Sequence, residues 1–246
     1  MRQLSGELLL TALDLGAQDT YLGRILTMLA LAHPEISREQ ISAWSLQDII
    51  IELLALRAIS FGPELAGYLA CPACGARLEF TLPIPPVVAS LHESKSTIQQ
   101  RCAIGETNFT MRPVTAADLF SVTTITDLPS ARKRLLASCI RETNDEGTDR
   151  EIYAELERPD FMRLAIRTFE QLQSSSEISI DLQCAECSRT HAIDLDLGRF
   201  VWTEVRHAAS RLMREVHELA SAYGWQEASI LAMSSNRRNA YLEMAR

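Results

Sequence analysis

The chain has 246 residues, of which 47% are hydrophobic, and this content favours a folded protein with a proper core over a disordered one. A net charge of −8 and an isoelectric point near 5.2 provide no overall positive field, which disfavours nucleic acid as a partner and favours protein. No apolar stretch reaches the roughly 18 residues of a membrane span, and the start lacks a signal-peptide pattern, so we expect a soluble, cytoplasmic protein.

The first 70 residues are predicted to form a helical segment. Apolar residues recur at helical spacing over residues 4–31, with a break near Gly16. Ser37 and Ser45, each placed just before a further apolar stretch, predict the starts of two more helices. The interruption at Gly62 separates these from a short apolar run over residues 65–70, and a helical pattern thus precedes Cys71. We expect these helices to pack beside the cysteines that follow.

Two Cys-x-x-Cys motifs lie far apart in the chain. Two intervening residues let a tight turn direct both sulfurs to one side, and two such turns supply the four thiolates of a closed, tetrahedral zinc site. Alternating apolar residues follow the first motif and flank the second, which is typical of a zinc ribbon divided into two halves. The motifs therefore predict one structural Zn²⁺, with these ligands: Cys71, Cys74, Cys184 and Cys187.

Other uses of these cysteines remain open. The two motifs could form separate metal sites with other ligands, or be a pair that has lost its metal. His191 could replace a sulfur ligand, although a position facing solvent on a strand is the simpler interpretation. A redox dithiol is disfavoured because a strand pattern rather than a helix start follows Cys71, and a disulfide because no secretory signal is present. Cys102 and Cys139 are predicted to be buried thiols, with extra metal ligands as the alternative.

Strand and helix patterns in the sequence distinguish two segments in the middle of the chain. Residues 71–115 should hold the first half of the ribbon, which ends at the prolines of residues 83–86, and a further strand near residues 108–112. Residues 87–107 carry little pattern. Residues 116–175 should form a central helical segment, with helices that begin after Thr115, near Pro129 and near Pro159, and a loop over residues 143–149.

The C-terminal part has the most regular pattern. Residues 176–197 should hold the second half of the ribbon, and residues 198–246 a long helix with a terminal helix pair. Apolar residues spaced by three and four from Val201 to Tyr223 predict one helix that ends at Gly224. The sequence thus predicts a mainly helical α+β fold, compact overall. In it a split zinc-ribbon-like β element is flanked by helical layers and a long C-terminal helix.

Catalysis finds little support in the sequence. The five histidines show no metal-hydrolase spacing, and neither a phosphate-binding glycine loop nor a nucleophile elbow is present, so we expect no enzyme activity. Near the C-terminus, aromatic and arginine side chains have the composition of an interface hot spot, although they could also only hold the terminal helices together. This candidate partner-binding set is Trp225, Arg237, Arg238 and Tyr241.

Several segments resemble proteins of contractile-tail operons. These are Phe61-Gly62-Pro63-Glu64-Leu65 before the first cysteine motif, the residues 200–204 that begin the long helix, and the terminal stretches 215–220, 223–228, 230–233 and 237–243. From about residue 45 to the C-terminus the chain is similar to the baseplate hub assembly chaperone family of T-even-type phages and its relatives in phage-like contractile injection systems. The resemblance implies hub, spike or tube-initiating proteins of a contractile tail as partners, with no membrane involved.

Three hypotheses follow. The leading one is a non-enzymatic assembly factor or component of the baseplate hub, held in shape by Zn²⁺ and found in the cytoplasm of the producing cell or within the assembled particle. The alternative is a zinc-ribbon nucleic-acid-binding or transcription accessory protein, for which Arg77, Arg189 and His191 are the nearby basic candidates. An enzyme that uses the cysteines is the third.

Overall fold

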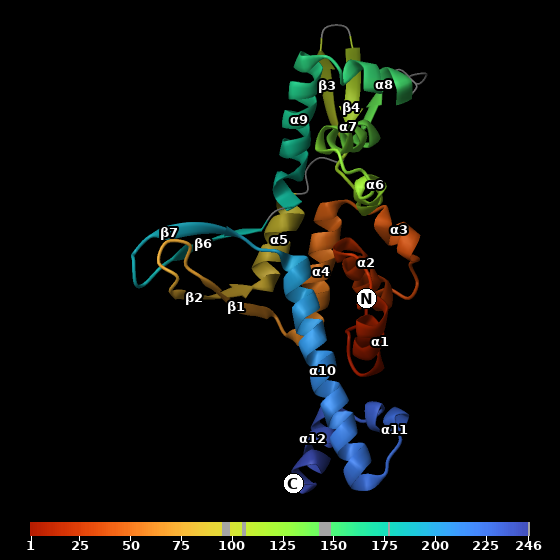
Figure 1. Cartoon of the computed structure of the whole chain (residues 1–246), viewed down its shortest axis with the longest axis vertical. Helices are drawn as coiled ribbons and strands as arrows, with labels where there is room; N and C mark the ends of the chain where they lie inside the picture. The colour runs from red at the N-terminus through yellow and green to blue at the C-terminus, as the bar shows by residue number, and fades with distance from the viewer. Residues whose placement is uncertain (95–98, 105–106, 143–148, 177, 246) are drawn as a thin grey trace.

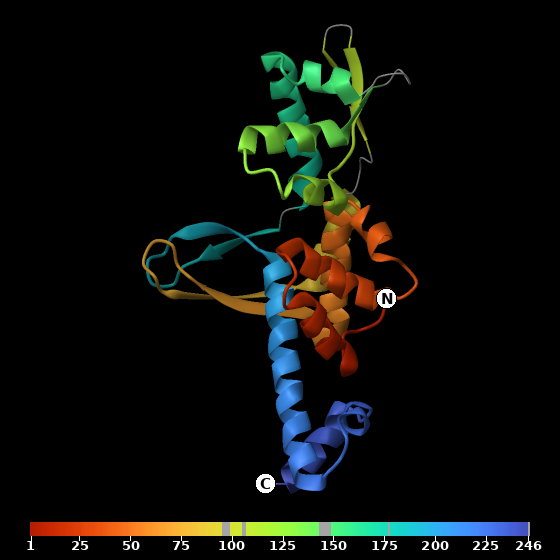
Figure 2. The same ribbon diagram turned by 45° about the vertical axis from the view of Figure 1, so that its right-hand side comes forward.

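The computed structural model describes residues 1–94, 99–104, 107–142, 149–176 and 178–245. The molecule is elongated: a helical body lies at the centre, an arm of two hairpins projects to one side, an α+β unit lies above, and a long helix leads down to a terminal helical unit (Figures 1 and 2). Where the chain is described, no helix combines the length and apolarity that crossing a bilayer requires.

The helical body forms the largest core. It consists of α1 (Glu7–Gly16), α2 (Tyr21–Ala32), α3 (Arg38–Ser42), α4 (Leu46–Phe61), α5 (Ile84–Ser94) and the first half of α10 (Leu197–Tyr223). Thr20, Ser37 and Ser45 each accept a hydrogen bond from a backbone N–H in the first turn, which fixes the starts of α2, α3 and α4. These helices bury a continuous apolar cluster that includes Leu26, Met28, Leu29, Leu53, Leu54, Leu56, Val201 and Val205.

The arm consists of two antiparallel hairpins that lie side by side and meet at their turns (Figures 1 and 2). One hairpin pairs β1 (Glu64–Ala70) with β2 (Arg77–Pro83), and the other pairs β6 (Ser179–Gln183) with β7 (Thr190–Asp194). Gly67 is required in β1, because a Cβ atom there would lie 2.8 Å from the ring of Phe80 and 3.1 Å from that of Phe200. This close packing holds the arm to the start of α10.

The α+β unit has a core of its own. It contains a three-stranded sheet in the order β3 (Gln100–Ile104), β4 (Thr107–Met111) and β5 (Ile140–Glu142), with four helices and a short 3₁₀ turn. Phe109 packs on Phe161 with ring centroids 4.8 Å apart, and both are fully buried. The helices are α6 (Ala116–Val122), α7 (Leu128–Cys139), α8 (Asp149–Glu155) and α9 (Pro159–Gln173), and η1 (Ser174–Ser176) leads back to the arm.

The long helix α10 has 27 residues and ends, as predicted, at Gly224, whose φ of 69° is the left-handed conformation that stops a helix. The chain then turns into α11 (Glu227–Leu231) and α12 (Ser235–Met244), which pack on the end of α10. Leu219, Ile230 and Leu242 form the small core of this terminal unit. The predicted fold class is therefore confirmed, including the long C-terminal helix, whereas the separate cores give an elongated shape in place of the compact one expected.

Some local predictions were wrong. The residues before Cys71 form strand β1 rather than continuing a helical pattern, because they pair along their whole length with β2. Residues 84–94 form α5, since the prolines at 85 and 86 occupy its first turn, where a missing N–H costs nothing. Strands β3 and β5 and helix α8 were not predicted. Within the predicted loop at residues 143–149, positions 143–148 lie outside the described residues.

Candidate metal centre

The tip of the arm is built from two turns with the same backbone hydrogen bonds. In the first, the Gly75 N–H donates to the Cys71 carbonyl at 2.9 Å, and the Cys71 N–H donates to the Ala76 carbonyl at 2.7 Å. In the second, the Ser188 N–H donates to the Cys184 carbonyl at 2.8 Å, and the Cys184 N–H donates to the Arg189 carbonyl at 2.9 Å. Each turn thus directs two cysteine side chains toward the other hairpin.

Both turns need a residue with positive φ directly after the second cysteine. This residue is Gly75 at φ 75° in the first turn and Ser188 at φ 58° in the second. Ser188 is the only non-glycine residue with positive φ among those the structure describes. Because L-residues avoid this region, the closed turn at Ser188 is held against a local conformational cost.

The four sulfurs gather into one cluster. The Sγ atoms of Cys71, Cys74, Cys184 and Cys187 all lie within 4.8 Å of one another. Two of the distances cross between the hairpins: Cys71 to Cys187 at 3.8 Å and Cys74 to Cys184 at 3.7 Å. A tetrahedron of sulfurs with metal–sulfur bonds of about 2.3 Å has edges of about 3.8 Å, so the cluster has the size of a tetrahedral thiolate site. The structure therefore brings together all four predicted ligands.

The cluster is shielded from solvent on one side. Cys71 and Cys184 are buried, Cys187 is half-buried and Cys74 is exposed. Leu78 packs against them as part of the same small apolar cluster, with Leu69 and Leu182 beside it. Hydrophobic side chains thus cover the side of the cluster formed by Cys71 and Cys184, and four cysteine ligands would leave no open position of the kind a catalytic zinc site keeps.

The acidity of the sulfurs reflects burial, nearby backbone N–H groups and the neighbouring sulfurs. Burial raises the pKa of Cys71, but N–H groups of Ala73 and Cys74 that point at the sulfur outweigh it and lower this pKa to about 6. The Ala76 N–H lowers the pKa of Cys74, yet burial and the neighbouring cysteine sulfurs raise it overall, to about 12. One thiolate thus forms readily and the next is opposed by its neighbours. A divalent cation would remove this opposition, because metal-bound cysteines are deprotonated.

His191 was expected to face solvent, and this prediction was wrong. It is half-buried on β7, and its Nε2 atom lies 3.5 Å from the Cys71 Sγ. The reason is the register of the second hairpin, which pairs His191 with Leu182 and so turns it toward the cysteines. The cluster of four sulfurs is complete without it, so His191 lies beside the site.

Of the other two cysteines, Cys139 lies away from this cluster. Cys139 is fully buried in the core of the α+β unit, where burial raises its pKa to about 11, as expected for an inert thiol. The side chain of Cys102 lies outside the described residues.

Of the residues predicted to bind a partner, three form an aromatic cluster with an arginine beside it, and the fourth is a buried arginine. Trp225 stacks on Tyr223 at 4.5 Å between ring centroids and meets Tyr241 edge-on at 4.8 Å, while the guanidinium of Arg237 lies 5.7 Å from the Tyr241 ring centroid. Arg238, by contrast, is buried. Its guanidinium donates to Glu215 at 2.9 Å and to the Met233 carbonyl at 2.6 Å.

Tyr223 is a member of this aromatic cluster that sequence reasoning assigned only to the apolar face of the long helix. It is 37% exposed, and its hydroxyl donates to the Tyr241 carbonyl at 3.1 Å. The sequence signal for its place in the cluster is its position directly before Gly224, because the turn at this glycine brings the following residues back alongside Tyr223.

A comparison with protein families gives one match. The model of the family described as T4 bacteriophage base plate protein matches residues 7–202, from the start of α1 to the first turns of α10, and this span includes all four clustered cysteines. No curated protein and no solved structure matches the chain. Since the matched span covers most of the sequence, the chain belongs to the T4 bacteriophage base plate protein family.

Proposed function

We propose that this protein is a non-enzymatic assembly factor or component of a contractile-tail baseplate hub, and that one structural Zn²⁺ holds its arm together. The observation that carries the proposal is the cluster of four sulfurs, all within 4.8 Å of one another, in a member of a baseplate protein family. The donor set fits zinc, because tetrahedral thiolate ligation is typical of its structural sites. Cys71, Cys74, Cys184 and Cys187 would be the ligands.

The metal would act on the geometry of the whole molecule. Strand β1 follows α4, β2 leads into α5, and β7 leads into α10, so both hairpins are rooted in the helical body. Each hairpin has only two strands, which is marginal for independent stability. An ion at the tip would join the two hairpins into one rigid arm and contribute folding free energy.

The partners we propose are hub, spike or tube-initiating proteins of the baseplate. The family supports a baseplate partner in general. The terminal unit, which lies at the end of the long helix (Figure 1), supplies a candidate contact surface. In it the side chains of Trp225, Arg237 and Tyr241 lie together. Arg238 would support this surface from beneath through Glu215. Assembly would take place in the cytoplasm of the producing cell.

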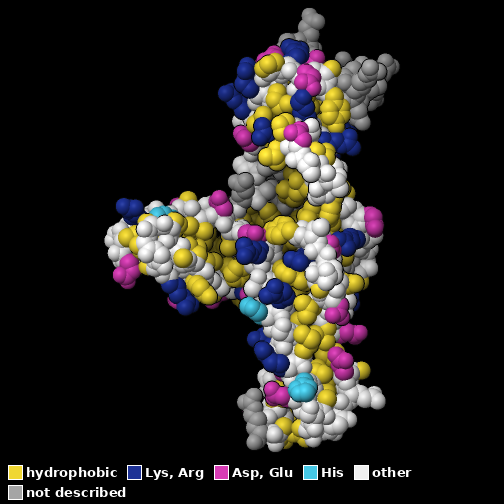
Figure 3. Space-filling view, in the orientation of Figure 1, with side chains coloured by type: hydrophobic (Ala, Val, Ile, Leu, Met, Phe, Trp, Pro, Cys, Tyr) yellow, Lys and Arg dark blue, Asp and Glu magenta, His cyan; other side chains and the backbone are white. Residues whose placement is uncertain are grey.

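Nucleic acid has less support as a partner. Charged side chains of both signs are spread along the arm, without a continuous basic surface on the face seen in Figure 3. Arg77, one of the basic candidates beside the cysteines, pairs with Glu79 at 3.0 Å and lies 4.0 Å over the Tyr68 ring. Glu79 therefore offsets the positive charge of Arg77 on this surface.

Co-expression tests this proposal. A tagged form of the protein is produced together with each hub, spike and tube-initiating protein encoded beside it, and retention is measured after purification at two salt concentrations. We expect at least one of these proteins to be retained. We also expect retention to fall in Arg237→Ala and to persist in Arg206→Ala, an exposed arginine on α10. If none is retained, the assembly proposal fails.

A further inference from the structure

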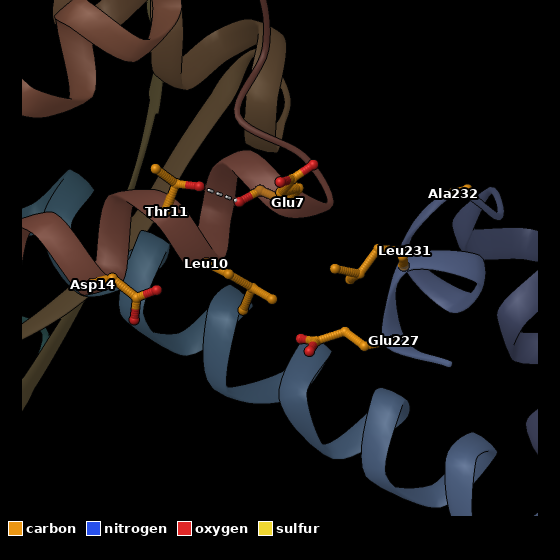
Figure 4. Close-up of a pocket in the computed structure, with 8 residues that line it drawn as sticks. Glu7, Leu10, Thr11, Asp14, Glu227, Leu231 and Ala232 are labelled. Atoms are coloured by element: carbon orange, nitrogen blue, oxygen red, sulfur yellow. Dashed lines mark hydrogen bonds between the residues drawn. The ribbon is translucent and has the colours of Figure 1, made fainter. Parts of the chain in front are cut away.

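A groove separates the helical body from the terminal unit. It has a volume of about 480 Å³, and its walls are α1 on one side and α11 on the other. Figure 4 shows Leu10 and Leu231 pointing toward one another across it, with α10 beneath. We call this the α1–α11 groove.

The two walls belong to different cores. Leu9 and Ala12 of α1 lie in the large core of the body, whereas Ile230 of α11 lies in the small core of the terminal unit. The walls approach one another at one end, where a Cβ atom added to Gly6 would lie 3.5 Å from the Leu231 carbonyl oxygen. Below the groove, α10 contacts both α1 and α11.

The charge of the groove has one sign. Its ionisable lining residues are Glu7 and Asp14 on the α1 side and Glu227 on the α11 side. All three are exposed, and none makes an ion pair within the part of the chain that the structure describes. The groove thus has carboxylates on both rims and the apolar Leu10 and Leu231 between them. Such a surface is complementary to a ligand with a row of apolar side chains flanked by positive charges.

We propose that the α1–α11 groove binds a basic, amphipathic helical segment of a partner protein. Apolar side chains of the segment would fill the space between Leu10 and Leu231, and lysines or arginines on both sides would pair with Glu7, Asp14 and Glu227. Recognition of this kind places one apolar helix face in a groove and uses charge to set its orientation. The occupant would also brace the terminal unit against the body, since it touches both walls.

This proposal stands apart from the zinc site, and its test needs neither a baseplate protein nor a change at the cysteines. The probe is a fluorescent helical peptide with leucines at i and i+4 and lysines on both flanks. A control peptide carries glutamates in place of the lysines. Binding to the full-length protein is followed by fluorescence anisotropy at low and at moderate salt.

The decisive comparison uses two triple variants that lose the same charge. Glu7→Gln, Asp14→Asn and Glu227→Gln neutralise the groove, whereas a matched control variant neutralises three exposed carboxylates elsewhere: Glu170→Gln, Asp181→Asn and Glu218→Gln. We expect the lysine peptide to bind the unaltered protein and the control variant alike, and to bind the groove variant about tenfold more weakly. Leu231→Ala should weaken binding as well, at both salt concentrations.

Three outcomes would overturn the proposal. One is absence of binding by the lysine peptide, and another is equal binding of the glutamate peptide. The third is equal weakening in both triple variants, which would show only a response to net charge. Circular dichroism of all variants establishes that the comparison is made between folded proteins.

Discussion

Arg57 and Glu204 form a bidentate ion pair that joins α4 to α10. The guanidinium donates to the two carboxylate oxygens at 3.0 and 2.8 Å, and its remaining nitrogen donates to the carbonyls of Gly62 and Glu64. Arg57 is only 4% exposed. One buried side chain thus fixes the end of α4, the start of the arm and the long helix relative to one another.

Loss of the Glu204 carboxylate should therefore destabilise the protein. In Glu204→Gln the Arg57 charge stays buried without its counter-ion, and we expect the free energy of unfolding to fall by about 3 kcal/mol. Urea denaturation followed by circular dichroism measures this. The matched control is Glu79→Gln at the exposed Arg77 pair, where we expect a change within about 0.5 kcal/mol. Equal effects in the two variants would contradict this account of the joint.

The two cysteine turns predict opposite effects of a glycine exchange. Ser188→Gly removes the cost of a positive φ and should raise the free energy of unfolding by about 0.5 to 1 kcal/mol, while Gly75→Ser should lower it by about 1 kcal/mol. Nothing lies within 4 Å of a Cβ atom added at Gly75, so the effect would come from the backbone alone. Thermal denaturation of the metal-loaded proteins checks this. Changes of the same sign would refute it.

Asp118 should make the stability of the α+β unit depend on acid pH. Burial raises its pKa, but the hydrogen-bonded Arg112 and the Thr115 N–H outweigh this and lower it from 3.8 to about 2. The carboxylate is 9% exposed and bonds Arg112 at 2.6 and 2.9 Å. Because the folded-state pKa lies below the unfolded one, the stabilisation is complete above about pH 4 and is lost as the pH falls toward 2.

The variant Asp118→Asn isolates this contribution. At pH 6 it should lower the free energy of unfolding by about 2 kcal/mol relative to the natural protein, and this difference should shrink as the pH falls from 4 to 2. Urea denaturation of both proteins over the pH range measures the difference. Asp181→Asn, at an exposed carboxylate on β6, is the control and should show none. A difference that stays constant with pH would contradict the role given to Asp118.

The neighbouring Arg237 and Arg238 of α12 should respond differently to replacement by alanine. Arg238→Ala removes the bond to Glu215 within the terminal unit and should speed hydrogen exchange of α11 and α12. Arg237→Ala, at an exposed position, should leave exchange unchanged and reduce only the retention of a baseplate partner. Hydrogen exchange combined with co-purification separates the two. If Arg237→Ala alone disturbed exchange, the division between contact and support would be wrong.

The clustering of the four cysteines could be predicted because the signal is repeated. Two Cys-x-x-Cys motifs, each beside alternating apolar residues, leave few arrangements other than convergence. The regular spacing from Val201 to Tyr223 likewise specified α10, and Thr115, Ser37 and Ser45 marked helix starts correctly. These features depend on residues close in sequence.

The parts that were not predicted depend on distant contacts. Residues 65–70 become strand because β2 lies beside them, and the apolar run alone does not distinguish strand from helix. Pro85 and Pro86 indicated the end of a strand and concealed a helix start. The groove between α1 and α11 exists only because α10 carries the terminal unit beyond the body and the turn at Gly224 folds α11 back toward α1, and no local pattern encodes this arrangement.

The metal content of the purified protein tests the central claim most directly. The zinc content of the natural protein, of Cys184→Ser and of Cys139→Ser is measured by elemental mass spectrometry. The melting temperature of each protein is measured before and after treatment with a chelator. We expect about one zinc per chain in the natural protein and in Cys139→Ser, its loss in Cys184→Ser, and a lower melting temperature after chelation. A folded natural protein that holds no metal, and whose melting temperature the chelator leaves unchanged, would contradict the account.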